Sequence, residues 1–221
     1  MRSDILLEIH DRLYETFGPQ HWWPGETPFE IMIGAILTQN TNWRNVERAI
    51  ANLREANLLD ARRLAVERRR RIAALIRPAG YFNIKAERLK QFVGWFMARC
   101  DGNVAAFRGI RTPVLRRALL TVKGIGPETA DSILLYALNR RVFVVDAYTR
   151  RVLSRHGLAD VRDTYDTIRA MFETRLPKSV RLYNEYHALF VRLGKEICRP
   201  RPRCEACPLR SLLGPPQIEA R

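Results

Sequence analysis

Apolar residues recur three and four positions apart through most of the chain. The clearest segments of this kind are 5–13, 29–37, 46–53, 89–96, 133–137 and 182–193. This spacing places the apolar side chains on one face of an α-helix, so the pattern predicts stacked amphipathic helices. Glycine and proline separate the segments at 18–19, 24–25, 78–80, 123–127 and 176–177. We expect turns there, and an all-α fold that requires no sheet.

One run departs from the helical pattern. Residues 141–145 read Arg-Val-Phe-Val-Val and are followed by an acidic residue, Asp146. Five residues of this kind are typical of a buried extended segment, and we expect a connector between two helices. A short strand is the alternative interpretation.

The composition is that of a folded globular protein and excludes a disordered tail. The chain has 221 residues, 47% of them hydrophobic, which is enough for one large domain or two small ones. Its longest apolar stretch, 31–37, is far shorter than the roughly 20 residues of a membrane helix. The first residues carry charges where a signal peptide would be apolar. We expect a cytoplasmic protein that does not bind membranes.

The charge balance is strongly basic. Lys and Arg total 38 against 23 Asp and Glu, a formal net charge of +15, and only five of the basic residues are Lys. The planar guanidinium of arginine matches phosphate oxygens two at a time, so this excess favours a nucleic-acid partner. A general arginine bias of the genome is the alternative explanation.

The cysteines are unevenly placed. Cys100 stands alone, whereas Cys198, Cys204 and Cys207 fall within ten residues. Disulfides are rare inside cells, and a Cys-x2-Cys pair with a third Cys just upstream can converge on one centre. The spacing therefore predicts a metal site near the C-terminal end, from about residue 198 to 213.

A glycine-containing turn joins two helical patterns at residues 119–130. The turn reads Lys-Gly-Ile-Gly-Pro, with Gly124, Ile125 and Gly126 at its centre. Two glycines allow the backbone to approach a phosphate, and the helix that follows presents N–H groups to the anion. We interpret residues of about 113–138 as a DNA-binding helix-hairpin-helix. An ordinary turn between two helices is the alternative.

Asp146 follows the hairpin by about twenty residues, at the end of the apolar connector. A carboxylate at the start of a helix is commonly an N-cap. It can also be a buried charge that stabilises a cationic transition state. Both interpretations stay open from the residues alone.

Taken together, the hairpin, the aspartate and the cysteine loop resemble the endonuclease III superfamily of DNA glycosylases over nearly the whole chain. The resemblance implies two lobes, a helical barrel at 21–135 and a second lobe of 1–20 with 136–221. It implies a hydrolase of N-glycosyl bonds in base excision repair, acting on damaged double-stranded DNA as a monomer. Asp146 matches the catalytic aspartate. Gln39 matches a glutamine that fills the gap left by the extruded base, and Tyr81 matches a residue that wedges into the opposite strand.

The chain departs from the family pattern at two positions. Glu128 stands where members with lyase activity carry a lysine, which implies absent or weak lyase activity. Leu213 stands where the fourth cysteine of a [4Fe-4S] cluster is expected, so the resemblance implies a cluster with an incomplete ligand set, Cys198, Cys204 and Cys207. A zinc site that uses His187, or no metal, is the alternative. The exposed arginines of the family's cluster loop match Arg199, Arg201 and Arg203.

Aromatic residues narrow the expected substrate. Trp23, Pro24 and Trp43 flank the Gln39 segment and resemble the base pocket of endonuclease III-like 3-methyladenine DNA glycosylases. Flat apolar walls suit a base that has left the stack, although each tryptophan could equally be a core residue. We expect a glycosylase for an alkylated purine. The alternatives are a glycosylase for oxidised or mismatched bases and a non-catalytic helix-hairpin-helix protein that binds DNA.

Overall fold

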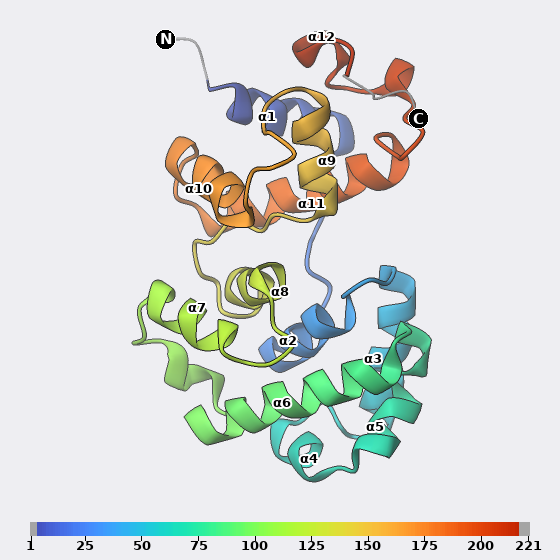
Figure 1. Cartoon of the computed structure of the whole chain (residues 1–221), viewed down its shortest axis with the longest axis vertical. Coiled ribbons are helices and arrows are strands. Elements are labelled where there is room, and N and C mark those ends of the chain that lie inside the picture. Colours follow the sequence, from blue (N-terminus) through green and yellow to red (C-terminus); the bar gives the residue numbers. More distant parts are fainter. Residues whose placement is uncertain (1–3, 217–221) are drawn as a thin grey trace. The chain divides into compact units, whose positions relative to one another are not determined.

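The computed structural model describes residues 4–216, and every regular element in that range is a helix (Figure 1). The prediction of an all-α fold is therefore confirmed. No helix within this range combines the length and the apolar composition that a membrane span requires.

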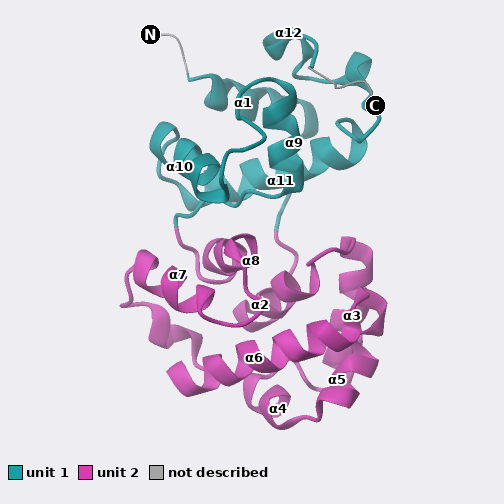
Figure 2. Cartoon of the chain, in the orientation of Figure 1, with its two compact units in different colours: residues 1–22, 141–221 teal, residues 23–140 magenta. Residues whose placement is uncertain are grey.

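The chain divides into two compact units, as Figure 2 shows in teal and magenta. Unit 1 joins Met1–Trp22 to Arg141–Arg221, and unit 2 is the continuous segment Trp23–Arg140. The lobes expected from the sequence have boundaries within a few residues of these. Their assignment as functional lobes stays a prediction.

Unit 2 is organised around a buried helix. Its elements are α2 (Pro28–Leu37), α3 (Trp43–Glu55), α4 (Ala61–Val66), α5 (Arg69–Leu75), η1 (Arg77–Ala79), α6 (Phe82–Cys100), η2 (Val104–Phe107), α7 (Thr112–Leu120), α8 (Pro127–Ser132) and the π-helical turn η3 (Ile133–Ala137). Eight of the ten residues of α2 are buried, as expected for a helix that is apolar on every side. It contacts α3, α6, α8 and η3, and so links the hairpin to the rest of the unit.

A buried ion pair braces the hairpin. Asp131 of α8 is fully buried, and its two carboxylate oxygens accept from Nε and Nη2 of Arg116 in α7 at 2.7 and 3.0 Å. A two-point contact of this kind fixes orientation as well as distance. The two helices of the hairpin are therefore held together by this pair.

Unit 1 consists of α1 (Ile5–Phe17), α9 (Ala147–Arg155), α10 (Tyr165–Arg175), α11 (Val180–Glu196), η4 (Cys204–Ala206) and α12 (Arg210–Leu213). Helix α11 contacts α1 and α9, and buries an aromatic cluster. Tyr186 stacks on Phe190 with ring centroids 4.7 Å apart, and its hydroxyl donates to the Leu6 carbonyl at 2.8 Å. These contacts tie the N-terminal helix to the C-terminal half of the chain.

The segment 141–145 is extended and forms no strand. Its backbone finds side-chain partners instead: the Phe143 N–H donates to Glu173 at 2.9 Å, and the Val145 N–H donates to the Tyr165 hydroxyl at 3.3 Å. The prediction of a buried connector is confirmed. The connector delivers Asp146 to the first turn of α9.

Candidate functional site

The turn of the hairpin requires glycine at one position. Gly124 has φ +91°, in the region that favours glycine, and the side chain of Arg88 occupies the space where a Cβ would lie. Gly126 is exposed and is the N-cap residue of α8, whereas the Ile125 side chain is buried. Ile125 can therefore present only its main chain at the surface of the turn.

Gln39 is held against the hairpin. Its Nε2 donates to the Gly124 carbonyl at 3.0 Å and to the Thr129 hydroxyl at 2.9 Å, and its Oε1 accepts from Arg88 Nη1. The amide thus connects the end of α2 to both sides of the glycine turn. Sequence reasoning did not find Arg88, which contacts the glutamine and the glycine together.

Tyr81 is an exposed aromatic residue on a strained backbone. Its side chain is 66% exposed, and its φ of 46° lies in the left-handed region, which non-glycine residues rarely adopt. Ile84, one turn later, is also exposed. A strained and exposed apolar pair at the start of α6 is consistent with the predicted wedge role of Tyr81.

A buried lysine links these two elements. Lys85 Nζ donates to the Leu37 carbonyl and to the Ala79 carbonyl, each at 2.8 Å. The first contact holds the end of α2 just before Gln39, and the second holds the turn just before Tyr81. Burial, with a smaller contribution from the nearby Arg88 charge, lowers the pKa of Lys85 to about 8.

Asp146 is a buried N-cap with a second partner. Its Oδ1 accepts from the Thr149 N–H at 2.7 Å, which caps α9, and its Oδ2 lies 3.6 Å from Nε2 of His187 in α11. Both side chains are buried within unit 1. The cap interpretation is therefore correct, and it leaves one carboxylate oxygen free of the cap.

The pKa of Asp146 has opposing causes. Burial acts to raise this pKa, but the contacts with His187 and then with Thr149 outweigh burial and hold it below its usual value. The carboxylate is therefore ionised at neutral pH. A charged, desolvated carboxylate is the group that an oxocarbenium-like transition state requires.

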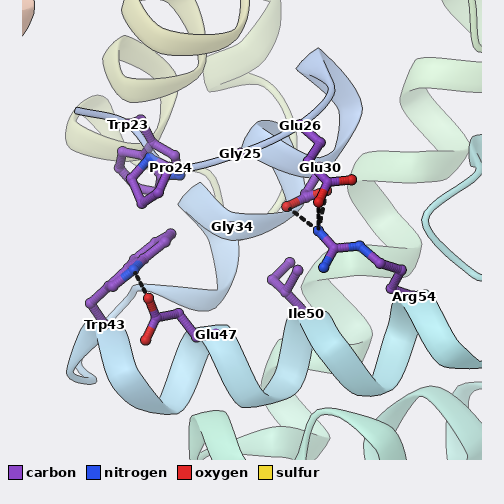
Figure 3. Close-up of a pocket in the computed structure, with 10 residues that line it drawn as sticks. All are labelled: Trp23, Pro24, Gly25, Glu26, Glu30, Gly34, Trp43, Glu47, Ile50 and Arg54. Carbon is purple, nitrogen blue, oxygen red and sulfur yellow. Dashed lines mark hydrogen bonds and ion pairs between the residues drawn. The ribbon is translucent and has the colours of Figure 1, made fainter. Parts of the chain in front are cut away.

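The structure brings Trp23, Pro24 and Trp43 together around one cavity of about 340 Å³ (Figure 3). The two indole rings meet edge to face with centroids 4.9 Å apart, and Trp23 also packs on Tyr136 at 5.0 Å. The indole of Trp23 lies across Gly34 of α2, where there is no side chain in the way. Trp22 does not line this cavity.

The rest of the cavity is acidic, which sequence reasoning missed. Glu30 in α2 is buried, and both of its oxygens accept from Arg54 Nη2 at 2.9 Å, while Glu26 lies 3.3 Å from the same guanidinium. Glu47 accepts from Trp43 Nε1 at 2.8 Å. Three carboxylates and one guanidinium line the cavity, a formal charge of −2 inside a protein of +15.

The spacing of residues along α3 was the sequence signal that could have identified part of this cavity lining. Trp43, Glu47, Ile50 and Arg54 recur at four, three and four positions, and Figure 3 shows them along one face of that helix. Residues so spaced on a helix share a face. The sequence therefore contained the α3 face that carries Glu47 and Arg54, but only the structure shows that this face lines the tryptophan cavity together with Glu26 and Glu30.

Glu128, at the position of the family lysine, is exposed in the first turn of α8. Lys123 is exposed on the opposite side of the glycine turn. Lys195 belongs to unit 1. Within unit 2, Lys123 therefore does not occupy the position of the family lysine in the hairpin.

The three clustered cysteines line one cavity of about 250 Å³ in unit 1. Cys100 belongs to unit 2, and its Sγ contacts the Phe96 carbonyl at 3.1 Å. His187 does not line this cavity and faces Asp146 instead, so the structure does not support a zinc site that uses His187. Sulfur donors on a shared cavity fit the chemistry of an iron–sulfur cluster.

The arginines of the cysteine loop are exposed. Arg199, Arg201 and Arg203 alternate with prolines, and none of them forms an ion pair with a described carboxylate. The loop is anchored from α9, where Arg155 donates to the carbonyls of Arg199 and Pro200 at 2.7 and 3.0 Å. A fixed loop whose three arginines form no ion pair with a described carboxylate is suited to phosphate contacts, although Arg199 Nε also donates to the Lys195 carbonyl at 2.8 Å.

Comparison with known proteins identifies the family of this chain. The family model described as HhH-GPD superfamily base excision DNA repair protein matches residues 33–178. A relative from Methanocaldococcus jannaschii, named as a candidate DNA repair glycosylase, is 46% identical over 211 residues, with 95% of this chain and 96% of the relative covered.

Two solved structures share the fold. The crystal structure of the H. pylori 3-methyladenine DNA glycosylase MagIII bound to 1,N6-ethenoadenine has a TM-score of 0.73 at 28% identity, covering 87% of this chain and 98% of that one. A non-covalent endonuclease III–DNA complex has a TM-score of 0.81 at 20% identity, covering 94% and 93%. This chain belongs to the HhH-GPD superfamily of base excision DNA repair proteins and is a DNA glycosylase.

Proposed function

We propose that this glycosylase is monofunctional and releases alkylated purines, 3-methyladenine first, from duplex DNA. The observation that carries the proposal is the cavity of Figure 3, in which an aromatic wall faces an excess of carboxylates. A 3-methylated adenine in DNA is a cationic ring. Indole faces and negative charges both stabilise a cationic ring more than they stabilise a neutral base.

The energies are compatible with this selection. Extruding a base costs a few kcal/mol in lost pairing and stacking, about what one or two aromatic contacts return at roughly 1–3 kcal/mol per stacked base. The cationic ring gains further from the net charge of −2 that Glu26, Glu30, Glu47 and Arg54 together give the cavity. The resemblance to the MagIII structure, whose name specifies 3-methyladenine, supports the same substrate class.

The chemistry we assign to Asp146 follows from its charge. Cleavage of the N-glycosidic bond leaves positive charge on the sugar, and the carboxylate opposes that charge and orients the attacking water. An alkylated base is already a good leaving group, so the cavity needs no strong acid. Gln39 and Tyr81 hold the duplex open, and their loss is expected to slow every substrate alike.

A panel of damaged duplexes tests the proposal. Base release and strand cleavage are measured separately for alkylated, oxidised and mismatched bases. We expect rapid release of alkylated purines without strand cleavage. Preferred release of an oxidised or mismatched base would overturn the substrate assignment, and DNA binding without release of any base would favour the non-catalytic alternative.

The absence of a lysine at residue 128 predicts the absence of lyase chemistry. A carboxylate cannot form an imine with the sugar, so borohydride reduction on a damaged or abasic duplex is expected to trap no covalent adduct. A Glu128→Lys variant provides the positive comparison for the trapping assay. A strong adduct with the unmodified protein would contradict the prediction and would direct attention to Lys123 and Lys195.

The contact between His187 and Asp146 predicts a shift in pH dependence. His187→Gln removes the main cause that lowers the pKa of Asp146, so burial dominates and this pKa rises. Because the rate falls as the carboxylate becomes protonated, the acid limb of the single-turnover rate is expected to move to higher pH. His21→Gln, an exposed histidine of the same unit, is the control. An unchanged acid limb in His187→Gln would contradict the assigned role.

We also propose that Cys198, Cys204 and Cys207 hold a [4Fe-4S] cluster, which, when bound, would stiffen the loop that carries the arginines. The donors fit, since three thiols share one cavity and Arg155 Nη1 donates to the Cys198 sulfur at 3.2 Å. Hydrogen bonds of this kind stabilise thiolate ligands.

The arginine loop is expected to contribute to the salt dependence of DNA binding. Changing Arg199, Arg201 and Arg203 to Ala should reduce the slope of log K against log salt by up to about 2.7, at roughly 0.9 per phosphate contact. The matched control changes Arg62, Arg69 and Arg71, which are exposed but paired with carboxylates. A slope that is unchanged in the loop variant would remove this loop from the interface.

A further inference from the structure

We propose that the ring nitrogen Nδ1 of His156 is the fourth ligand of the iron–sulfur cluster, in place of the thiolate absent at Leu213. The inference rests on the cluster proposed above and is independent of which base the enzyme releases. Imidazole replaces thiolate on iron in Rieske [2Fe-2S] centres, which shows that a histidine can ligate the iron of an iron–sulfur cluster. His156 is the residue that follows the last turn of α9.

The first observation is a shared cavity. His156 and the three cysteines line the same 250 Å³ space, which is large enough for several water molecules at about 30 Å³ each. Most of the other lining residues are apolar or proline. A space of this size, with sulfur and nitrogen donors on its walls, suits a group of several atoms.

The second observation is an unsatisfied atom. Nδ1 of His156 is buried and has no hydrogen-bond partner. Buried polar atoms are nearly always paired, so an orphaned ring nitrogen on a residue that lines a cavity shared with three thiols needs an explanation. An iron ion in that cavity would be its partner.

The third observation links His156 to the missing cysteine. The backbone of Leu213 lies within hydrogen-bonding reach of the imidazole. The histidine therefore stands beside the position from which the family's fourth thiolate would come.

The end of α9 is fixed to the cysteine loop. Arg155 donates to Cys198 Sγ and to two loop carbonyls, and Arg151 Nε donates to the Cys198 carbonyl at 2.7 Å. A histidine between a rigid helix and this anchored loop has little freedom to move away from the cavity. Ligand positions held in this way are preorganised.

A single metal ion fits the arrangement less well. Within residues 4–216, no three His, Cys, Asp or Glu side chains come close enough together to hold one ion. Zinc needs all its donors about 2.0–2.3 Å from one point. Donors that surround a cavity without meeting at one point suit a cluster, in which each ligand binds a different iron.

The test is spectroscopic and uses the full chain, purified without oxygen and reconstituted with iron and sulfide. We expect about four irons per chain and, in a paramagnetic state of the cluster, a strong nitrogen coupling in pulsed EPR. Labelling the four histidines of the chain with nitrogen-15 should convert that coupling to the pattern of the new isotope.

Variants assign the nitrogen. In His156→Ala the coupling should vanish, and a chelator should bleach the cluster about tenfold faster or more. Adding Leu213→Cys to that variant should restore the iron content and the slow bleaching, but not the coupling. His187→Gln is the control and should keep the coupling.

Three results would overturn the proposal: a reconstituted protein without iron, a cluster without nitrogen coupling, or a His156→Ala variant with unchanged coupling and bleaching. Base release measured on the same samples separates the two proposals. Release of alkylated purine by a protein without this coupling would leave the substrate assignment intact.

Discussion

Asp146→Asn is expected to lower the single-turnover rate of base release by about 100-fold or more, with little change in DNA affinity. The amide oxygen can still accept from the Thr149 N–H, so the cap of α9 is preserved. What is lost is the negative charge that opposes the oxocarbenium-like sugar. The rate is measured with enzyme in excess over a damaged duplex, and the affinity on the same duplex.

The control is another capping aspartate. Asp60 caps α4 in the same way, by accepting from the Arg63 N–H at 2.9 Å, but it is exposed. Asp60→Asn should keep the full rate. If Asp146→Asn also keeps it, then Asp146 is only a cap, and the catalytic assignment is wrong.

Local patterns in the sequence predicted most of the helices, and they also predicted the glycine turn of the hairpin. The periodic segments 5–13, 29–37 and 182–193 all lie in helices, because burying an apolar face requires the helical repeat that the sequence displays. The extended run before Asp146 was predictable because it lacks the helical repeat and is almost entirely apolar. The four apolar side chains that follow Arg141 have no polar alternation, so residues 142–145 had to be buried.

Pairings between distant residues were not predictable. His187 lies far along the chain from Asp146, and only the packing of α11 on α9 brings them within 3.6 Å. Lys85 reads as one basic residue among many until the structure shows its ammonium buried between two carbonyls. Each depends on tertiary geometry, which periodicity does not encode.

The charge of the chain and the charge of the cavity have opposite signs, and both bear on function. A formal charge of +15 draws the protein to DNA through long-range attraction that salt weakens. The carboxylates of the tryptophan cavity act only at short range. In the function proposed here they discriminate among bases after the protein has bound, a role that the overall composition could not reveal.

Trp43→Ala is therefore expected to slow release of a cationic alkylpurine selectively, by about tenfold or more, if it removes one stacking wall. The indole contacts Trp23 edge to face and orients Glu47 through its N–H, so its loss removes both an aromatic surface and the anchor of a carboxylate. The measurement compares single-turnover release of 3-methyladenine with that of a neutral lesion such as 1,N6-ethenoadenine.

Two further variants separate a pocket effect from a packing effect. Trp95 is a half-buried tryptophan of the same unit that stacks on Phe92 and Phe107 and does not line the cavity, so Trp95→Ala should affect both substrates equally. Glu47→Gln keeps an acceptor for Trp43 but removes a charge, and should slow only the cationic substrate. Equal slowing of both substrates by Trp43→Ala would make Trp43 a core residue. The acidic cavity would then lose its role in choosing the base.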